Sequence, residues 1–153
     1  MTNSVIQIEN PDQPEIRALL NASDAYHAAL YPAESNHPVD MAALQCANTI
    51  FFVARVDGLA HGIGAIIRRE GYAEIKRIFV DPTARGLKLG SRLLAALEAD
   101  ARTAGVPCLR LETGIKQPEA IALYRAAGFR EIDPFGTYRH DPNSLFMEKI
   151  LTS

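Results

Sequence analysis

A glycine-containing segment with three basic residues is the first part of the sequence that could do chemistry. It reads IFVDPTARGLKLGSR, from Ile78 to Arg92. An apolar run that predicts a strand leads into a polar turn, and a helix begins directly after it. Backbone N–H groups and the positive end of the helix dipole then face one spot, where Arg85, Lys88 and Arg92 add positive charge. The segment predicts an anion site, although glycines serving only the turn would look the same. It is neither a Walker loop nor a GxGxxG fingerprint.

A second candidate lies in ETGIKQPEAIALYRAAGF, from Glu112 to Phe129. Its apolar residues recur at helical spacing, which places Ala120, Leu123 and Tyr124 on one face. Gln117 comes just before this helix. A tyrosine at such spacing is, by itself, more often a core residue than a catalytic acid.

Together the two segments resemble the GNAT superfamily of acyl-CoA-dependent N-acetyltransferases, and the likeness runs from about residue 5 to residue 151. The family's phosphate motif, R/Q-x-x-G-x-G/A, corresponds to residues 85–90, with Lys88 at a position where the family has glycine. The family pattern N-x-x-A-x-x-L-Y-x-x-x-G-F corresponds to Gln117, Ala120, Leu123, Tyr124, Gly128 and Phe129. Gln117 replaces the asparagine of that pattern.

The resemblance implies where acetyl-CoA binds. Its pyrophosphate would lie on the turn and helix start at 86–91, and its pantetheine arm would pair with backbone at Ile78 and Val80. The thioester would lie where that strand splays from strand 108–113, and Tyr124 would protonate the leaving thiolate. The residues implied to bind acetyl-CoA are Ile78, Phe79, Val80, Arg85, Gly86, Leu87, Lys88, Leu89, Gly90, Ser91, Gln117, Ala120 and Leu123.

Two carboxylates are candidates for a general base. An amine must lose a proton before it attacks a thioester, so a base is useful, whereas direct transfer needs no acyl-enzyme nucleophile. Glu112 matches a glutamate used by the ribosomal-protein alanine acetyltransferase branch of the family. Glu74 lies where other members place a base, and strict alternation along its strand predicts that Glu74, Lys76, Ile78 and Val80 share one face. The sequence leaves the choice between Glu112 and Glu74 open.

Two loops are expected to border the acceptor pocket, again from the resemblance. One carries Glu34, Asn36 and His37, and the other is Phe135–Tyr138. Loops of this kind carry specificity, and plain connections would have the same composition.

The periodicity predicts the order β-α-α-β-β-β-α-β-α-β-β. Strands are expected at 5–8, 49–56, 59–67, 72–80, 108–113, 129–132 and 144–151, and helices at 14–30, 41–46, 89–104 and 118–127. The two last strands are expected to pair with each other. The expected class is α/β (α+β): a GNAT fold with a mixed, mostly antiparallel sheet of about seven strands and helices on both faces. One N-acetyltransferase domain is expected over residues 4–151.

Composition excludes several other classes. The 153 residues carry 16 Lys+Arg against 18 Asp+Glu, a net charge of −2, which argues against a dedicated nucleic-acid partner. At 48% hydrophobic and 22% charged, the chain is ordinary for a globular domain rather than a disordered one. The two cysteines and four histidines have no ligand spacing, so no metal is expected. No segment reaches transmembrane length, so no membrane partner is expected and the default compartment is the cytoplasm.

The expected function is transfer of an acetyl group from acetyl-CoA to a primary amine of a small molecule or protein by direct transfer. The alternative is a non-catalytic acyl-CoA-binding module of the same fold, and a nucleotide at the same helix start is a further rival. The partners are then acetyl-CoA and an amine acceptor that the sequence does not identify. The oligomeric state is open, with a homodimer as the default for soluble proteins.

Overall fold

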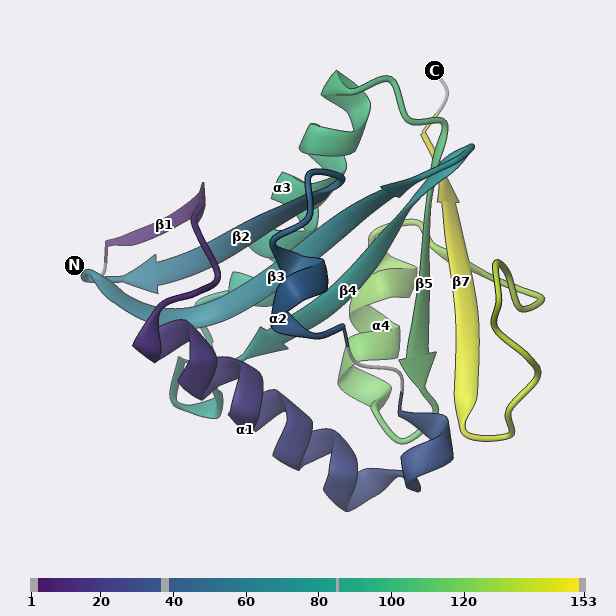
Figure 1. Cartoon of the computed structure of the whole chain (residues 1–153), viewed down its shortest axis with the longest axis horizontal. Helices are drawn as coiled ribbons and strands as arrows, with labels where there is room; N and C mark the ends of the chain where they lie inside the picture. Colours follow the sequence, from purple (N-terminus) through teal and green to yellow (C-terminus); the bar gives the residue numbers. More distant parts are fainter. Residues whose placement is uncertain (1–2, 37–38, 85, 152–153) are drawn as a thin grey trace.

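Seven strands form one sheet in the computed structural model, which describes residues 3–36, 39–84 and 86–151 (Figure 1). The strands are β1 (Ser4–Ile8), β2 (Thr49–Val56), β3 (Leu59–Arg69), β4 (Tyr72–Val80), β5 (Cys108–Gly114), β6 (Arg130–Ile132) and β7 (Ser144–Ile150). The helices are α1 (Pro14–Leu30), α2 (Met41–Leu44), α3 (Leu89–Thr103) and α4 (Pro118–Ala126), with short 3₁₀ turns at Ala33–Ser35 and Pro82–Ala84. The predicted fold class is confirmed.

The strands lie in the order β1-β2-β3-β4-β5-β7-β6. Strands β1 to β4 are successive antiparallel neighbours. Among the described strands, β4 and β5 are the one parallel pair. Strand β7 pairs antiparallel with β6, as predicted, and its other edge pairs with β5, so that it lies between them.

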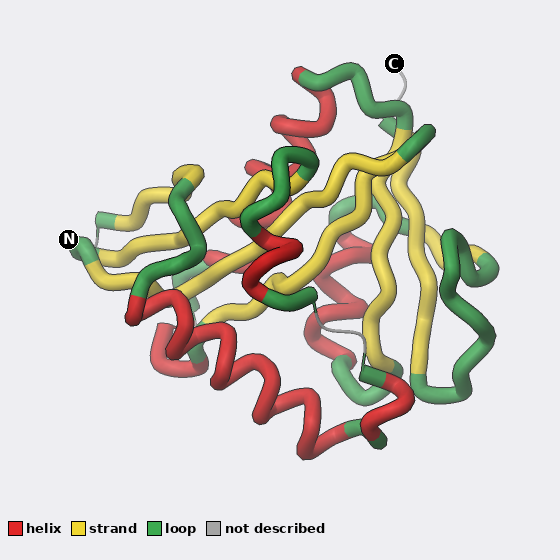
Figure 2. The backbone as a smooth tube through the Cα atoms, in the orientation of Figure 1, coloured by secondary structure: helices red, strands yellow, loops and turns green. Residues whose placement is uncertain are grey.

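Helices cover both faces of the sheet (Figure 2). Helix α3 turns an apolar stripe toward one face, made by Leu89, Leu93, Leu94, Leu97 and Ala101. Tyr124 of α4 belongs to the same core cluster. On the opposite face, Ile16, Leu19 and Leu20 of α1 and Leu44 of α2 pack against β2 and β3. The sheet therefore separates two apolar clusters, one under α3 and α4 and one under α1 and α2.

Local signals set the element ends. Pro14 occupies the first turn of α1, and Tyr31 ends the helix directly before Pro32. The strand predicted over 59–67 extends to Arg69, because Arg69 pairs with Tyr72 across a tight turn in which Gly71 has a φ of +83°. The helix predicted over 41–46 ends earlier, at Leu44.

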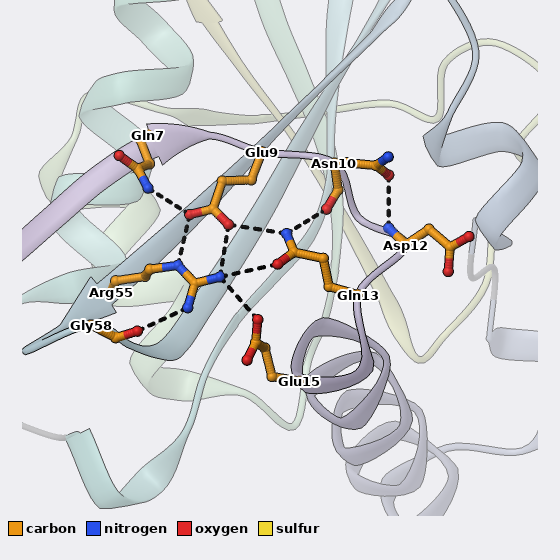
Figure 3. A network of polar contacts seen from close by, with 8 residues as sticks. All are labelled: Gln7, Glu9, Asn10, Asp12, Gln13, Glu15, Arg55 and Gly58. Atoms are coloured by element: carbon orange, nitrogen blue, oxygen red, sulfur yellow. Dashed lines mark hydrogen bonds and ion pairs between the residues drawn. The ribbon is translucent and has the colours of Figure 1, made fainter.

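A polar network around Arg55 fixes the start of α1 (Figure 3). The guanidinium donates two hydrogen bonds of 2.8 Å to the carboxylate of Glu9 and others to Gln13, Glu15 and the Gly58 carbonyl. These bonds hold the pKa of Glu9 at about 2, below its usual 4.5. The network joins the β1–α1 connection to β2 and the β2–β3 turn, and so sets the direction in which α1 leaves the sheet.

A β-bulge in β4 overturns one expectation. Ile63 of β3 pairs with Phe79, and two residues later Ala65 pairs with Lys76, so β4 contains one extra residue there. That residue is Arg77, with a φ of +62°. One extra residue reverses the alternation. The prediction that Glu74 and Lys76 share a face with Ile78 and Val80 is therefore wrong.

The bulge sends the two ends of β4 to different clusters. Before it, Ala73 and Ile75 face the α3 cluster and Glu74 faces away; after it, Ile78 and Val80 face the α3 cluster. Phe79 packs with the α1 cluster.

Candidate active site

Strands β4 and β5 part halfway along their length. Their pairing covers three residue pairs, from Ala73 with Leu109 to Ile75 with Leu111. Beyond Ile75 the two strands diverge, and α4 is visible behind the opening between them (Figure 1). The edge of β4 that carries the bulge therefore has no strand partner on the β5 side.

A cavity of about 320 Å³ lies at this divergence. Its walls include residues 75–78 of β4 and 111–114 of β5, together with Tyr124 of α4. His27 of α1 and Tyr31, which directly follows that helix, close another side. Asn36, one of the predicted acceptor-loop residues, also lines it. The site combines elements that are far apart in the sequence.

Tyr124 presents a buried phenol to the cavity. Tyr124 is 7% exposed. Its ring makes an edge contact with Phe129, with 5.9 Å between the ring centroids. Burial raises the pKa of Tyr124 to about 12. No described residue forms a hydrogen bond with its hydroxyl. The phenol is thus protonated at neutral pH and available to a bound molecule.

The two candidate carboxylates occupy different surroundings. Glu112 lines the cavity with Tyr124, and one of its oxygens accepts a hydrogen bond of 2.7 Å from the Ser144 hydroxyl. Glu74 is 2% exposed and does not line this cavity. Its oxygens accept hydrogen bonds from Tyr138 at 2.5 Å and from Arg69 at 3.1 Å. The structure brings Glu112 and Tyr124 together and ties Glu74 into a separate buried cluster.

The predicted anion site lies at the start of α3. Lys88 has a left-handed backbone (φ +57°) and directly precedes the helix, and its side chain does not cap the helix. The first N–H groups of α3 are thus left for another acceptor. Gly86 has a φ of +89° and open space around it, which suits a turn that approaches a ligand. Leu87 is partly buried against the core, and Ser91 is exposed.

Two residues of this segment have roles that the sequence did not reveal. A Cβ on Gly90 would lie 3.3 Å from Leu123, so this glycine allows α3 to pack closely against α4. Arg92 donates hydrogen bonds to the hydroxyl and carbonyl of Ser4, which draws it toward β1. Arg85, the first residue of the motif, lies outside the described residues, as does His37 of the acceptor loop.

Gln117 connects α4 to α1. Its side-chain oxygen lies 3.2 Å from the Tyr31 hydroxyl and 3.3 Å from the Gly114 amide, and its nitrogen lies 3.4 Å from His27 Nε2. His27 Nδ1 donates to the Ser23 carbonyl at 2.7 Å, which leaves Nε2 as an acceptor for Gln117. Sequence reasoning missed His27 and Tyr31 as cavity residues, since no spacing links α1 to α4.

The remaining predicted residues line or support this region. Ala120 and Leu123 pack on the α3 cluster, as do Ile78 and Val80. Glu34 and Tyr138 line a second cavity, described below, while Phe135 is buried beside Tyr138. Among the described residues, no group of three His, Cys, Asp or Glu side chains is placed to hold a metal ion. None of the described helices is long and apolar enough to cross a bilayer.

Comparison with known proteins identifies the class. Residues 9–129 match the acetyltransferase (GNAT) family, and the chain belongs to that family. An IAA acetyltransferase from Azospirillum brasilense is 49% identical over 153 residues, which cover 99% of this chain and 100% of that protein. A crystal structure from Klebsiella pneumoniae, described as an acyl-CoA N-acyltransferase, has a TM-score of 0.83 at 41% identity and covers 97% of this chain and 98% of its own. The protein is an acetyltransferase.

More distant structures share the fold. PaiA N-acetyltransferase from Thermoplasma acidophilum, solved with coenzyme A, has a TM-score of 0.74 at 18% identity, covering 96% of this chain and 99% of its own. At this identity the likeness concerns the fold alone.

Proposed function

We propose that the protein transfers the acetyl group of acetyl-CoA directly to a primary amine, with Glu112 as the general base and Tyr124 as the general acid. The observation that carries this proposal is the shared cavity of Glu112 and Tyr124 at the divergence of β4 and β5. A base and an acid on one cavity suit a reaction in which an amine loses a proton and a thiolate gains one.

The fold offers a path for acetyl-CoA. The uncapped start of α3 suits the pyrophosphate, because helix N-termini bind anions through free N–H groups and the dipole. The unpaired edge of β4 from Lys76 to Val80 suits the pantetheine amides, which can pair with backbone there as another strand would. The cosubstrate supplies the acetyl group as an activated thioester at the inner end of this path.

Glu112 and Tyr124 then divide the proton chemistry. Glu112 takes a proton from the incoming amine, and its bond from Ser144 orients the carboxylate. Tyr124 gives a proton to the departing sulfur; its raised pKa keeps that proton in place until a thiolate forms. Glu74 is the weaker candidate for base, since it does not line the cavity that holds Tyr124 and instead binds Tyr138 and Arg69.

The acceptor is a primary amine of a small molecule or of a protein. The name of the Azospirillum brasilense relative gives IAA as the compound that protein acetylates, so IAA belongs in any screen of acceptors for this chain. The cavity volume of about 320 Å³ favours a small acceptor group at the thioester.

The test is coenzyme A release from acetyl-CoA with a panel of amines and IAA, followed by pH–rate profiles of Glu112→Gln and Glu74→Gln. Glu112→Gln should lose the low-pH limb and about 10²–10⁴ in rate, the usual worth of a general base. Glu74→Gln should keep the limb and lower the melting temperature instead. If Glu74→Gln loses the low-pH limb and Glu112→Gln keeps it, Glu74 is the base. Tight acetyl-CoA binding without turnover of any acceptor would favour the binding-module alternative.

A further inference from the structure

Lys76 stands between two cavities. The second cavity, of about 470 Å³, is lined by Glu34, Val39, Arg69 and residues 137–141. Lys76 lines this cavity and also the one that holds Glu112 and Tyr124. Its side chain is 11% exposed. The other three lysines of the chain, Lys88, Lys116 and Lys149, line neither cavity.

The Lys76 amine is held by a hydroxyl. Its Nζ donates a hydrogen bond of 2.8 Å to Tyr138 and lies 3.9 Å from Glu74. The Tyr138 hydroxyl in turn donates to Glu74. Burial lowers the pKa of Lys76, while the carboxylates of Glu74 and Glu112 oppose that shift. More of this amine is therefore neutral, and nucleophilic, than on an exposed lysine.

Because of the bulge at Arg77, Lys76 and the proposed pantetheine path lie on opposite faces of the sheet. Lys76 faces away from the α3 cluster, whereas Ile78 and Val80, on the proposed pantetheine path, face toward it. Lys76 is the one described residue that lines both cavities, and Glu112 lines the first of them. A primary amine of the protein itself thus borders the cavity in which an acceptor amine would react.

We propose that Lys76 is a site of self-acetylation, in which its ε-amine takes the place of an acceptor when none is bound. This inference rests on the proposed function, because it uses the same cosubstrate and cavity. A Nζ–C bond forms at the acetyl carbonyl and the C–S bond of the thioester breaks. The ammonium loses two protons in total: one reaches the coenzyme A sulfur through Tyr124, and the other leaves by way of Glu112. The products are acetyl-Lys76 and free coenzyme A.

Acetylation would change the junction of the cavities. The amide carries no charge, so the positive charge that faces Glu74 would be lost. The added acetyl group would also need room beside Tyr138. A protein acetylated at Lys76 therefore loses a positive charge at the edge of the cavity that holds Glu112 and gains bulk there.

The test incubates the full chain with acetyl-CoA and no acceptor, and follows acetyl occupancy of each lysine by peptide mass spectrometry. Lys116 is the internal control, because it is exposed and lines neither cavity. Its amine donates to the Leu30 carbonyl and lies 5.9 Å from the centroid of the Tyr31 ring. Lys76 should be acetylated at least about 10-fold faster than Lys116, since a neighbouring amine has a high effective concentration at the thioester. Excess free coenzyme A should slow acetylation of Lys76 and not of Lys116. The fast phase should be missing in Lys76→Arg.

Lys76 acetylation no faster than that of Lys116, or insensitive to coenzyme A, would overturn the inference. Parallel assays with added amines separate the two proposals. If the protein acetylates an added amine while Lys76 stays unmodified, the self-acetylation inference is wrong and the proposed function still holds. A preparation that acetylates neither contradicts both.

Discussion

The hydroxyl of Tyr31 occupies the space that a side chain on Gly114 would fill. A Cβ built on Gly114 would overlap the Tyr31 oxygen and the ring carbon that bears it. The hydroxyl accepts a hydrogen bond of 3.0 Å from the Lys116 amide and donates one to Gln117. The end of α1 is therefore docked onto the β5–α4 connection through a position that has room for glycine alone.

This contact predicts a strong coupling between the two residues. Gly114→Ala should destabilise the protein by about 1–3 kcal/mol, the usual cost of overpacking, and displace α1 from the cavity. Denaturant unfolding of Gly114→Ala, Tyr31→Ala and the double variant measures the coupling. The alanine should cost less when Tyr31 is absent. An equal cost in both backgrounds would mean that Tyr31 is not what excludes a side chain at Gly114.

Tyr124→Phe separates catalysis from packing. The hydroxyl has no hydrogen-bond partner among the described residues, so its removal should leave the melting temperature nearly unchanged. Turnover should fall by roughly 10²-fold if the phenol protonates the leaving thiolate. Melting temperature and kcat are measured on one preparation. A destabilised variant with wild-type turnover would instead identify Tyr124 as a purely structural residue.

The start of α3 is best probed at Ser91. Gly90→Glu would collide with Leu123 and confound binding with folding. Ser91→Glu adds a negative charge to the exposed first turn of α3. The charge stabilises the helix through its dipole but repels a bound phosphate. The acetyl-CoA dissociation constant should rise about 10-fold, which corresponds to roughly 1.4 kcal/mol. Ala95→Glu, exposed on the next turn of α3, is the matched control and should change affinity little. Calorimetry giving equal affinities for both variants would move the pyrophosphate away from this turn.

The Arg55–Glu9 pair predicts that the protein loses stability over a defined acidic pH range. The pKa of Glu9 is lowered from 4.5 to about 2, chiefly by the hydrogen bonds from Arg55. A lowered carboxyl pKa means that the stabilisation is complete above about pH 4.5 and is lost as the pH falls through 2. Glu9→Gln should therefore flatten the decline of melting temperature between these values.

Glu15→Gln is the matched control for this pair. Glu15 binds the same guanidinium at 3.1 Å, but its side chain is 52% exposed, so solvent screens the interaction. Glu15→Gln should therefore change the pH dependence of the melting temperature less than Glu9→Gln does. If the melting temperatures of wild type and Glu9→Gln fall equally between pH 4.5 and 2, the pair does not control stability in acid.

Much of the fold could be predicted because its elements obey simple periods. The apolar stripe from Leu93 to Ala101 specified α3, and the turn residues Gly58 and Gly71 separated the strands of the meander. The bulge at Arg77 could not be predicted, since Lys76, Arg77 and Ile78 have no turn composition. Its presence depends on pairing with β3, which no local pattern encodes.

The site was predictable where family motifs run along one segment. Glu112 and Tyr124 are twelve positions apart on consecutive elements, and the structure brings both to one cavity. The contacts of Gln117 with His27 and Tyr31 cross about ninety positions of sequence. Only the folded sheet brings these residues together, because it docks the C-terminal end of α1 on the β5–α4 connection.

The place of β7 in the sheet bears on synthesis of the protein. Strand β5 is flanked by β4 over three residue pairs, whereas β7 pairs with all seven of its residues, from Cys108 to Gly114. Until residues 144–150 leave the ribosome, β5 has an open edge, and Glu112 lacks the hydroxyl of Ser144. Open edges recruit other strands, so this stage of translation is the one most exposed to aggregation. A released chain truncated near residue 140 should accordingly depend on chaperones more than the complete one.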